Sequence, residues 1–262
     1  MRKWFNWIAL VTVFTVACVL LAGWQLDRRD LKLASIGLIQ TNYQREPISL
    51  EESLISNSFK LPEDTWQSVR VTGTYLSSEL LLVRNRPNNG QPGFEQLVPF
   101  RTDNGIVIFV SRGWLPTGSK QDLPDQNPRP SSSQTTIIGR IVPSEPKLDR
   151  SAPTGQIASI NTDLATELTN LDRTVANGYL RLVREIPEAS VTLKSMPSPS
   201  INEGNNLSYA AQWIIFAIMA IWALVWRVRR DAQLASGTLK VRRRKSRSEI
   251  DQDAEDEITR AK

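Results

Sequence analysis

Apolar residues are concentrated in two segments at opposite ends of the 262-residue chain. Trp4 to Leu26 and Asn205 to Trp226 contain no charged residue, and each segment has about the ~20 residues needed to cross the hydrocarbon core of a bilayer. The residues between them are polar enough to form a soluble domain. The pattern therefore predicts an N-terminal transmembrane anchor (1–26), a domain outside the membrane (27–204), a C-terminal transmembrane helix (205–226) and a charged tail (227–262).

The first apolar segment also has the position of a signal peptide, because it follows Arg2 and Lys3. Its apolar run is longer than the ~7–15 residues usual in a cleaved signal, and no small-x-small site precedes a polar start, which favours an uncleaved anchor. Thr15 to Cys18 loosely resembles a lipidation box, but the apolar residues that follow Cys18 argue against a lipoprotein.

Basic residues near the ends of the two segments predict the orientation. Eight Lys or Arg residues between Arg227 and Lys245 follow the second segment, against the single acid Asp231. This asymmetry places the C-terminus in the cytoplasm, and with two spans the N-terminus lies there too. Residues 27–204 are then extracytoplasmic.

The net charge of +5 could suggest a nucleic-acid-binding protein. The tail from residue 227 holds 11 Lys or Arg and 7 Asp or Glu, so it carries most of that charge and the domain is nearly neutral. The tail is basic first and acidic later, which is typical of a disordered cytoplasmic segment that touches anionic lipid. We expect no nucleic-acid partner.

Two residue types are rare in ways that limit the chemistry. The chain has no histidine, and its single cysteine, Cys18, lies inside the first apolar segment. Histidine-dependent triads and the commonest ligands for zinc, copper and haem iron are therefore missing. Copper transfer by the domain would have only the soft ligand Met196. We expect no metal site and no catalytic residues.

Several short segments within the domain are predicted to be strands. We expect a helix over 27–43 that continues out of the membrane, a short helix capped near Asn161 that ends by Leu171, and a hairpin turn at Thr102–Gly105. The expected strands are 69–75, 79–86, 94–101, 106–115, 135–142 and 178–186, with a loop over 121–133 and a linker over 187–205. The fold class is therefore α+β, with an antiparallel β-sheet or open barrel and one or two helices between two transmembrane helices.

Two groups of residues stand out as candidate sites. Tyr209, Gln212 and Trp213 share one face of the second span, and the amide of Gln212 should find a partner inside the membrane. The end of the first span, a cofactor or a client helix are the alternatives. Arg112 and Trp114 mark the end of a strand, where the simpler interpretation is an arginine paired with a carboxylate or carbonyl and a tryptophan in the core.

Five short motifs occur along the chain: a W-Q-x-x-R box followed by a lysine (Trp24, Gln25, Arg28, Lys32), V-x-G-x-[FY] (71–75), P-G-[FY] (92–94), V-x-R-G-[WF]-[VL]-P (110–116) and a closing N-H-L-[SQ]-Y-x-x-[QT]-W box (205–213). Together they resemble the surfeit locus protein one family of membrane-anchored assembly factors for cytochrome c oxidase, in an actinobacterial-like or other bacterial form. A family glycine near the first box is Ala22 here, and the histidine of the closing box is Asn206.

The resemblance implies a protein that assists maturation of the catalytic subunit of the oxidase, including insertion of haem a, in the plasma membrane of a bacterium. The family histidine is a suspected iron ligand, and asparagine is not a plausible replacement. Haem a would then be held without histidine, through apolar and propionate contacts such as Arg28 or Arg112, through Met219, or with ligation left to the client.

The sequence is therefore interpreted as a non-enzymatic assembly factor whose partners are the oxidase catalytic subunit, the bilayer and other assembly factors. The residues proposed for partner or haem contact are Trp24, Gln25, Arg28, Lys32, Arg112, Trp114, Asn206, Tyr209, Gln212 and Trp213. A membrane-anchored sensor or binding module that uses the loop 117–133 is the alternative. An enzyme built on Ser with Asp or Lys is weaker, since no nucleophile stands in a recognisable setting.

Overall fold

The computed structural model describes residues 2–237 of the chain. These residues form two compact units: one contains the chain up to Asp30 and from Gly204 onward, and the other is Leu31–Glu203. The long first helix belongs to both. Each unit is described by itself, the first as the helix pair and the second as the β domain.

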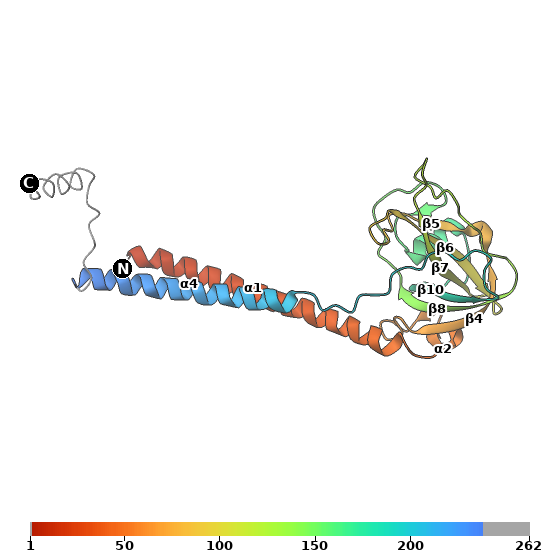
Figure 1. Cartoon of the computed structure of the whole chain (residues 1–262). Coiled ribbons are helices and arrows are strands. Elements are labelled where there is room, and N and C mark those ends of the chain that lie inside the picture. Colours follow the sequence, from red (N-terminus) through yellow and green to blue (C-terminus); the bar gives the residue numbers. More distant parts are fainter. Residues whose placement is uncertain (1, 238–262) are drawn as a thin grey trace, which may run out of the picture. The chain divides into compact units, whose positions relative to one another are not determined.

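The helix pair consists of α1 (Arg2–Asn42) and α4 (Asn206–Ala235), which run side by side in Figure 1. Both are long and apolar enough to cross a membrane, so the chain has the two helices of a membrane-anchored protein. The expected helix over 27–43 is confirmed as a direct continuation of α1. Helix α4 runs beyond Trp226, the expected end of the second span, and the part of the predicted tail from residue 238 lies outside the described residues.

The buried side chains of the helix pair are small. Within the unit that contains α1 up to Asp30 and α4, the buried apolar residues are Cys18 and Ala22 on α1 and Ala210 and Ala217 on α4. The guanidinium carbon of Arg227 lies 4.9 Å from the ring centroid of Trp7, so the end of α4 is beside the start of α1 and the helices are antiparallel. Close packing of small residues is a common basis of helix association in membranes.

The β domain is built from ten short strands and two short helices. Its strands are β1 (Ile48–Ser49), β2 (Leu54–Ile55), β3 (Ser58–Phe59), β4 (Ser68–Tyr75), β5 (Leu81–Val83), β6 (Gly93–Thr102), β7 (Val107–Pro116), β8 (Thr135–Pro143), β9 (Gln156–Ile157) and β10 (Gly178–Ile186). Its α-helices are α2 (Leu50–Ser53) and α3 (Thr162–Thr169), and a 3₁₀ turn spans Ser77–Glu79. Five of the six predicted strands are confirmed to within about two residues, a normal uncertainty in element ends.

The expected strand 79–86 is shorter in the structure, because the 3₁₀ turn takes its first residue and only Leu81–Val83 pairs with a neighbour. The expected short helix is confirmed as α3. The side-chain oxygen of Asn161 accepts a hydrogen bond of 2.9 Å from the backbone N–H of Leu164, and the helix ends at Asn170 in the left-handed conformation. Both ends therefore follow ordinary capping chemistry.

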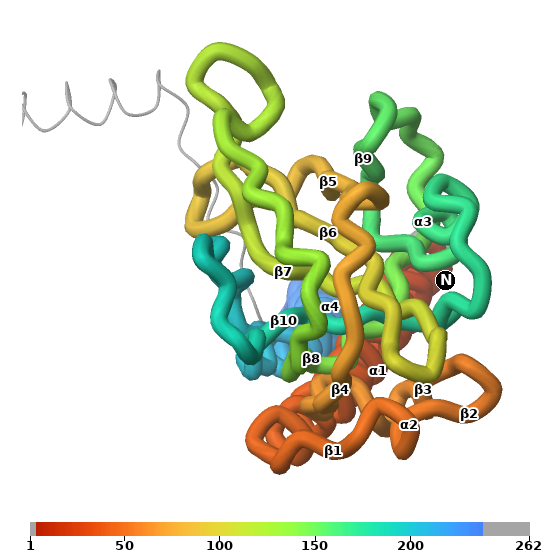
Figure 2. The backbone as a smooth tube through the Cα atoms, turned by 90° about the vertical axis from the view of Figure 1, so that its right-hand side faces the viewer, coloured from red at the N-terminus to blue at the C-terminus, as the bar shows by residue number. Residues whose placement is uncertain are grey.

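Eight strands form one sheet in the order β1-β4-β8-β10-β7-β6-β5-β9, and a further β4–β6 pairing joins the two ends of its central run. This pairing closes β4, β8, β10, β7 and β6 into a partial barrel (Figure 2). Gly73 lies at the closure, where a Cβ atom would collide with the carbonyl oxygen of Arg101. The barrel therefore requires glycine at the centre of the V-x-G-x-Y motif.

The strand pairing is mixed, which the expected antiparallel sheet did not include. Most pairs are antiparallel, but β1–β4, β10–β7 and β5–β9 are parallel. Two of these pairs use a two-residue strand that carries no alternation, and β10 returns to β7 from far along the chain. The partial barrel is nevertheless the expected class of fold.

Both faces of the central strands are buried. Ile108 and Val110 of β7 belong to a core inside the barrel, together with Phe100 and Leu180. Phe109, which points to the opposite face, joins a second core between the sheet and α3. Successive side chains of a strand alternate between faces, so a strand buried on both sides holds the positions of its polar residues firmly.

Candidate functional site

The residues of the first family-like box lie on α1, with different exposures. The side chain of Trp24 is 55% exposed. Arg28 and Lys32 are also exposed, whereas Gln25 is partly buried. Lys32 belongs to the part of α1 that is assigned to the β domain. Helix α1 thus exposes the aromatic ring of Trp24 and the basic group of Arg28 where its apolar run ends.

The closing box forms the first two turns of α4. Tyr209 is 50% exposed and Gln212 is exposed, while Asn206 and Trp213 are partly buried. Trp213 packs edge-to-face against Phe216, with 5.9 Å between the ring centroids. The side-chain amide of Gln212 makes no hydrogen bond to another described residue. Its amide therefore stays available on an otherwise apolar helix face.

The donor set of the chain does not fit a haem site that ligates iron. Residue 206 is an asparagine and no histidine occurs anywhere. Cys18 is buried among the small residues of the helix pair, and Met219 lies half-exposed on the outer face of α4. Within residues 2–237 no group of three His, Cys, Asp or Glu side chains could hold a metal ion. No step of the function is therefore assigned to bound haem or metal.

Arg112 lies in the β domain, at the centre of a buried polar network. It is 7% exposed, and its Nε donates a hydrogen bond of 3.0 Å to Oε1 of Glu185, which is 8% exposed. The same carboxylate oxygen accepts a 2.6 Å hydrogen bond from the hydroxyl of Tyr75, and Nη1 of Arg112 donates to Gln96 at 2.7 Å. Burial raises the pKa of Tyr75 above its ordinary value of 10, so the hydroxyl remains a donor. The simpler interpretation of Arg112, pairing with a carboxylate, is confirmed.

Trp114 is buried and structural in its contacts. Its indole N–H donates a 2.6 Å hydrogen bond to the carbonyl oxygen of Arg86, and the ammonium of Lys194 lies 5.0 Å from the ring centroid. Gly93, from the P-G-F motif, lies against the indole. Two family-like motifs that are separate in the sequence therefore pack on each other.

A second buried charge cluster surrounds Glu95, which is 1% exposed. Its carboxylate accepts a hydrogen bond from the hydroxyl of Ser111 and lies 3.4 Å from Nε of Arg86. Arg86 also contacts Glu145 at 2.5 Å. Burial raises the pKa of Glu95 above its ordinary value of 4.5, although the contacts with Ser111 and Arg86 lower it. Glu95 and Ser111 are closed to solvent, whereas the side chains of Arg86 and Glu145 are 21% and 27% exposed. The buried position of Glu95 fits a structural role better than proton transfer to a substrate.

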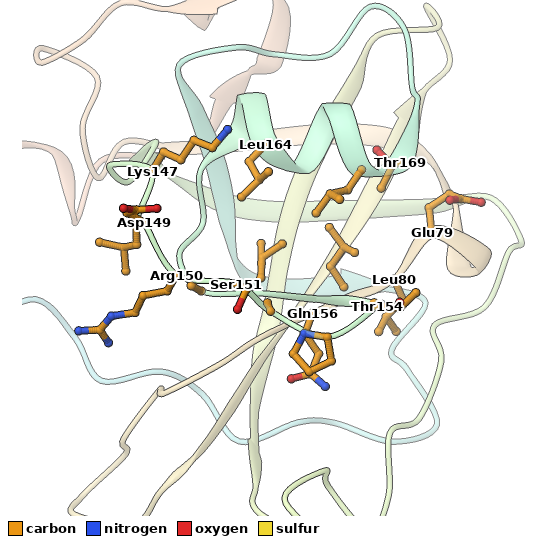
Figure 3. A pocket seen from close by; sticks show the side chains of 18 of the residues that line it. Glu79, Leu80, Lys147, Asp149, Arg150, Ser151, Thr154, Gln156, Leu164 and Thr169 are labelled. Carbon is orange, nitrogen blue, oxygen red and sulfur yellow. The ribbon is translucent and has the colours of Figure 1, made fainter.

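Figure 3 shows a cavity of about 730 Å³ beneath α3. Leu80 and Leu164 contribute apolar surface, and Lys147, Asp149 and Arg150 stand along its edge. The lining contains no nucleophile hydrogen-bonded to a base, which an acyl- or group-transfer site requires. The cavity is large enough for a ligand, but its lining does not form an acyl- or group-transfer site.

A smaller cavity, of about 250 Å³, lies where β8, β10 and β7 meet residues 195–198 of the linker. Arg112, Arg140 and Arg181 line it together with Tyr43 and Trp66. We call it the basic pocket. The sequence analysis missed Arg140 and Arg181, because single arginines inside strands form no motif.

Comparison with known proteins gives the assignment. The model of the SURF1 family matches residues 12–218, from α1 through the β domain into α4. The chain belongs to the SURF1 family. An uncharacterized SURF1-like protein of Mycobacterium tuberculosis is 32% identical over 224 residues, covering 82% of this chain and 80% of that protein.

Two further SURF1 relatives match at lower identity. A SURF1-like protein of Rickettsia felis is 28% identical over 223 residues, which cover 82% of this chain and 93% of that protein. The cytochrome oxidase assembly protein SHY1 of Saccharomyces cerevisiae is 30% identical over 110 residues, 41% of this chain and 28% of SHY1. The family resemblance is therefore confirmed, and SHY1 connects the family to oxidase assembly by name.

Proposed function

We propose that this SURF1 family member is an assembly factor for a haem–copper cytochrome c oxidase that acts on the catalytic subunit and is not an enzyme. Membership of the family and the similarity to SHY1 support a role in oxidase assembly. The observation that carries the finer proposal is the outward face at the start of α4. There an aromatic ring and an unbonded amide, those of Tyr209 and Gln212, stand on a helix apolar enough to cross a membrane.

This face is suited to a helix of another protein. Cys18, Ala22, Ala210 and Ala217 are the buried small residues of the helix pair, so the exposed side chains of Tyr209 and Gln212 are not needed to hold the pair together. An amide in a lipid environment is stabilised when it finds a hydrogen-bonding partner, by about 0.6–2 kcal/mol. A transmembrane helix of the catalytic subunit would supply that partner and bury Trp24 and Tyr209 at the same time. In this proposal Gln25, Arg28, Lys32, Asn206 and Trp213 support the same contact, and Arg112 and Trp114 shape the β domain.

The proposed topology has both termini in the cytoplasm and residues 27–204 outside, in the plasma membrane of a bacterium. Because Cys18 is the single native cysteine and is 1% exposed, an introduced cysteine would act as a specific reporter. We expect Ser132→Cys to react with a membrane-impermeant maleimide in intact cells and Ser236→Cys to react only after permeabilisation. The reverse result would contradict the topology.

Deletion of the gene tests the function directly. We expect a smaller haem a band in reduced-minus-oxidised membrane spectra and lower oxidase activity, both restored by the wild-type gene. Gln212→Leu should restore them less well at equal membrane abundance and co-purify less catalytic subunit. Ile218→Leu, at an exposed apolar position of the same helix, is the matched control. Normal spectra and activity in the deletion strain would rule out the assembly role and leave a membrane-anchored binding module.

A further inference from the structure

Two arginines lie next to each other on neighbouring strands of the β domain. Arg140 of β8 and Arg181 of β10 are directly paired in the antiparallel register, so their side chains leave the same face of the sheet. Like charges in this arrangement destabilise a sheet. A fold that keeps both arginines therefore needs negative charge beside them.

The described residues do not supply that charge as an ion pair. The guanidinium of Arg140 lies 3.7 Å from the ring centroid of Tyr43 and donates a 3.3 Å hydrogen bond to the Tyr43 carbonyl. Arg181 lies 5.1 Å from the ring centroid of Trp66 and donates a 3.3 Å hydrogen bond to the Pro197 carbonyl. Among the side chains of residues 4–237, no carboxylate lies within ion-pairing distance of either arginine.

Each of the two arginines also has a donor without an acceptor. The Nε atoms of Arg140 and Arg181 are buried and make no hydrogen bond within the described part of the chain. Glu95 is an acid whose pKa Arg181 lowers, but its carboxylate already contacts Ser111 and Arg86. Buried polar donors in folded proteins are normally satisfied. The two Nε atoms have almost no accessible surface, so a ligand with acceptor oxygens would contact the other guanidinium nitrogens of Arg140 and Arg181.

The basic pocket has the size and shape for such a ligand. Its volume of about 250 Å³ is just below the ~300–1,000 Å³ of pockets that hold drug-sized molecules. The charge of the third lining arginine, Arg112, is balanced by Glu185. Arg140 and Arg181 therefore bring two positive charges, neither in a direct ion pair with a described carboxylate, to a space that holds a small group or the end of a larger molecule.

We propose that the basic pocket binds a phosphate group through Arg140 and Arg181. A phosphate monoester carries ~1.5 to 2 negative charges at neutral pH, which matches the two guanidinium groups. Its oxygens accept the planar, charge-assisted hydrogen bonds that arginine forms well. The group comes either from free inorganic phosphate or from the headgroup of an anionic phospholipid. This site is separate from the α4 face and does not depend on the proposed function.

The test uses the full chain purified in detergent and titrated with inorganic phosphate by calorimetry, at constant ionic strength set with chloride. We expect saturable binding that weakens about ten- to hundredfold in Arg140→Gln and in Arg181→Gln, since each loses charge-assisted hydrogen bonds. Arg101→Gln, at an exposed arginine of β6, should bind like the wild type. The absence of saturable binding up to roughly 10 mM, or equal affinity in all four proteins, overturns the proposal.

A stability measurement keeps the proposal testable if a glutamine variant folds poorly. Phosphate should raise the Tm of the wild type more than chloride at equal ionic strength does, and Arg181→Lys should reduce that rise, because lysine keeps the charge but loses the planar fork. An equal rise in wild type and Arg181→Lys overturns the site. In phosphatidylcholine nanodiscs, phosphatidic acid should compete with inorganic phosphate if the lipid is the ligand. Unchanged phosphate affinity identifies the free ion.

Discussion

Arg112→Met is expected to destabilise the β domain strongly, although the change replaces a polar side chain with an apolar one of similar length. The substitution removes the guanidinium that contacts Glu185 at 3.0 Å and Gln96 at 2.7 Å. Glu185, which is 8% exposed, would then lose its cationic partner, with the hydroxyl of Tyr75 as its remaining hydrogen-bond donor from the network. Breaking a buried pair by removing one partner costs about 3–5 kcal/mol.

The double variant Arg112→Met with Glu185→Gln distinguishes the cost of breaking the ion pair from the cost of losing side-chain packing. It removes both charges together, so most of the cost of an unpaired buried carboxylate disappears. We expect it to recover about 1–3 kcal/mol relative to Arg112→Met, which is the usual size of coupling between contacting residues.

The assay is thermal unfolding of the full chain in detergent, followed by near-ultraviolet circular dichroism. For a unit of this size, 1 kcal/mol corresponds to roughly 2–4 °C in Tm, so Arg112→Met should lower the Tm by about 6–20 °C. A loss below about 1 kcal/mol, or strictly additive effects in the double variant, would refute the view that the network is a closed, mutually satisfied unit.

Three further predictions concern other parts of the structure. Because burial raises the pKa of Glu95, the folded state binds the proton of its carboxyl group more tightly than the unfolded state does. The resulting contribution to stability is full below about pH 4.5 and is lost as the pH rises through the folded pKa. Glu95→Gln should abolish this loss in unfolding measurements across that pH range. Gly93→Ala would place a Cβ 2.5 Å from the indole of Trp114 and should destabilise the β domain by about 1–3 kcal/mol in the same assay. Ala217→Leu should overpack the helix pair and expose Cys18, which is 1% exposed, so that a membrane-permeant maleimide labels it faster.

The chain offers a matched control for each of these changes. Gly23→Ala adds a Cβ with no other atom within 4 Å and should be neutral. Ile218→Leu changes a side chain that is 60% exposed on α4 and should leave Cys18 labelling as it is. Glu46→Gln, at an exposed position, should keep the pH dependence of the wild type. An equal effect of control and test variant would contradict the corresponding reasoning.

Short apolar-rich runs bounded by turn residues made much of the β domain predictable from the sequence. The strand at 178–186 is confirmed with those boundaries as β10, because an apolar-rich run lies there between Asn177 and Pro187. By contrast, β1 and β9 contain two residues each, too few to show a period. Their parallel pairing depends on where longer segments have already placed the chain, so local pattern could not reveal it.

The candidate residues were predictable to different degrees. The pairing of Arg112 with a carboxylate was expected from its position in a strand, but its partner Glu185 is 73 residues away, and register between distant strands decides that choice. The closing box at the start of α4 could be recognised in the sequence, because a side-chain amide such as that of Gln212 is unusual in an apolar helix. The opposition of Arg140 and Arg181 follows from the β8–β10 register alone, so it carries no signal in the sequence.

The same register explains why neighbouring arginines in one pocket have different roles. Arg112 and Arg181 both line the basic pocket, and both come from the central strands of the barrel. A residue of β10, Glu185, neutralises Arg112, whereas the cross-strand partner of Arg181 is another arginine. A buried arginine with its own carboxylate stabilises the fold and has little charge left for a ligand. An arginine paired with another arginine destabilises the sheet until an anion binds between them. The different cross-strand partners, more than any difference in residue type, therefore distinguish the structural arginine of this domain from the arginines of its proposed binding site.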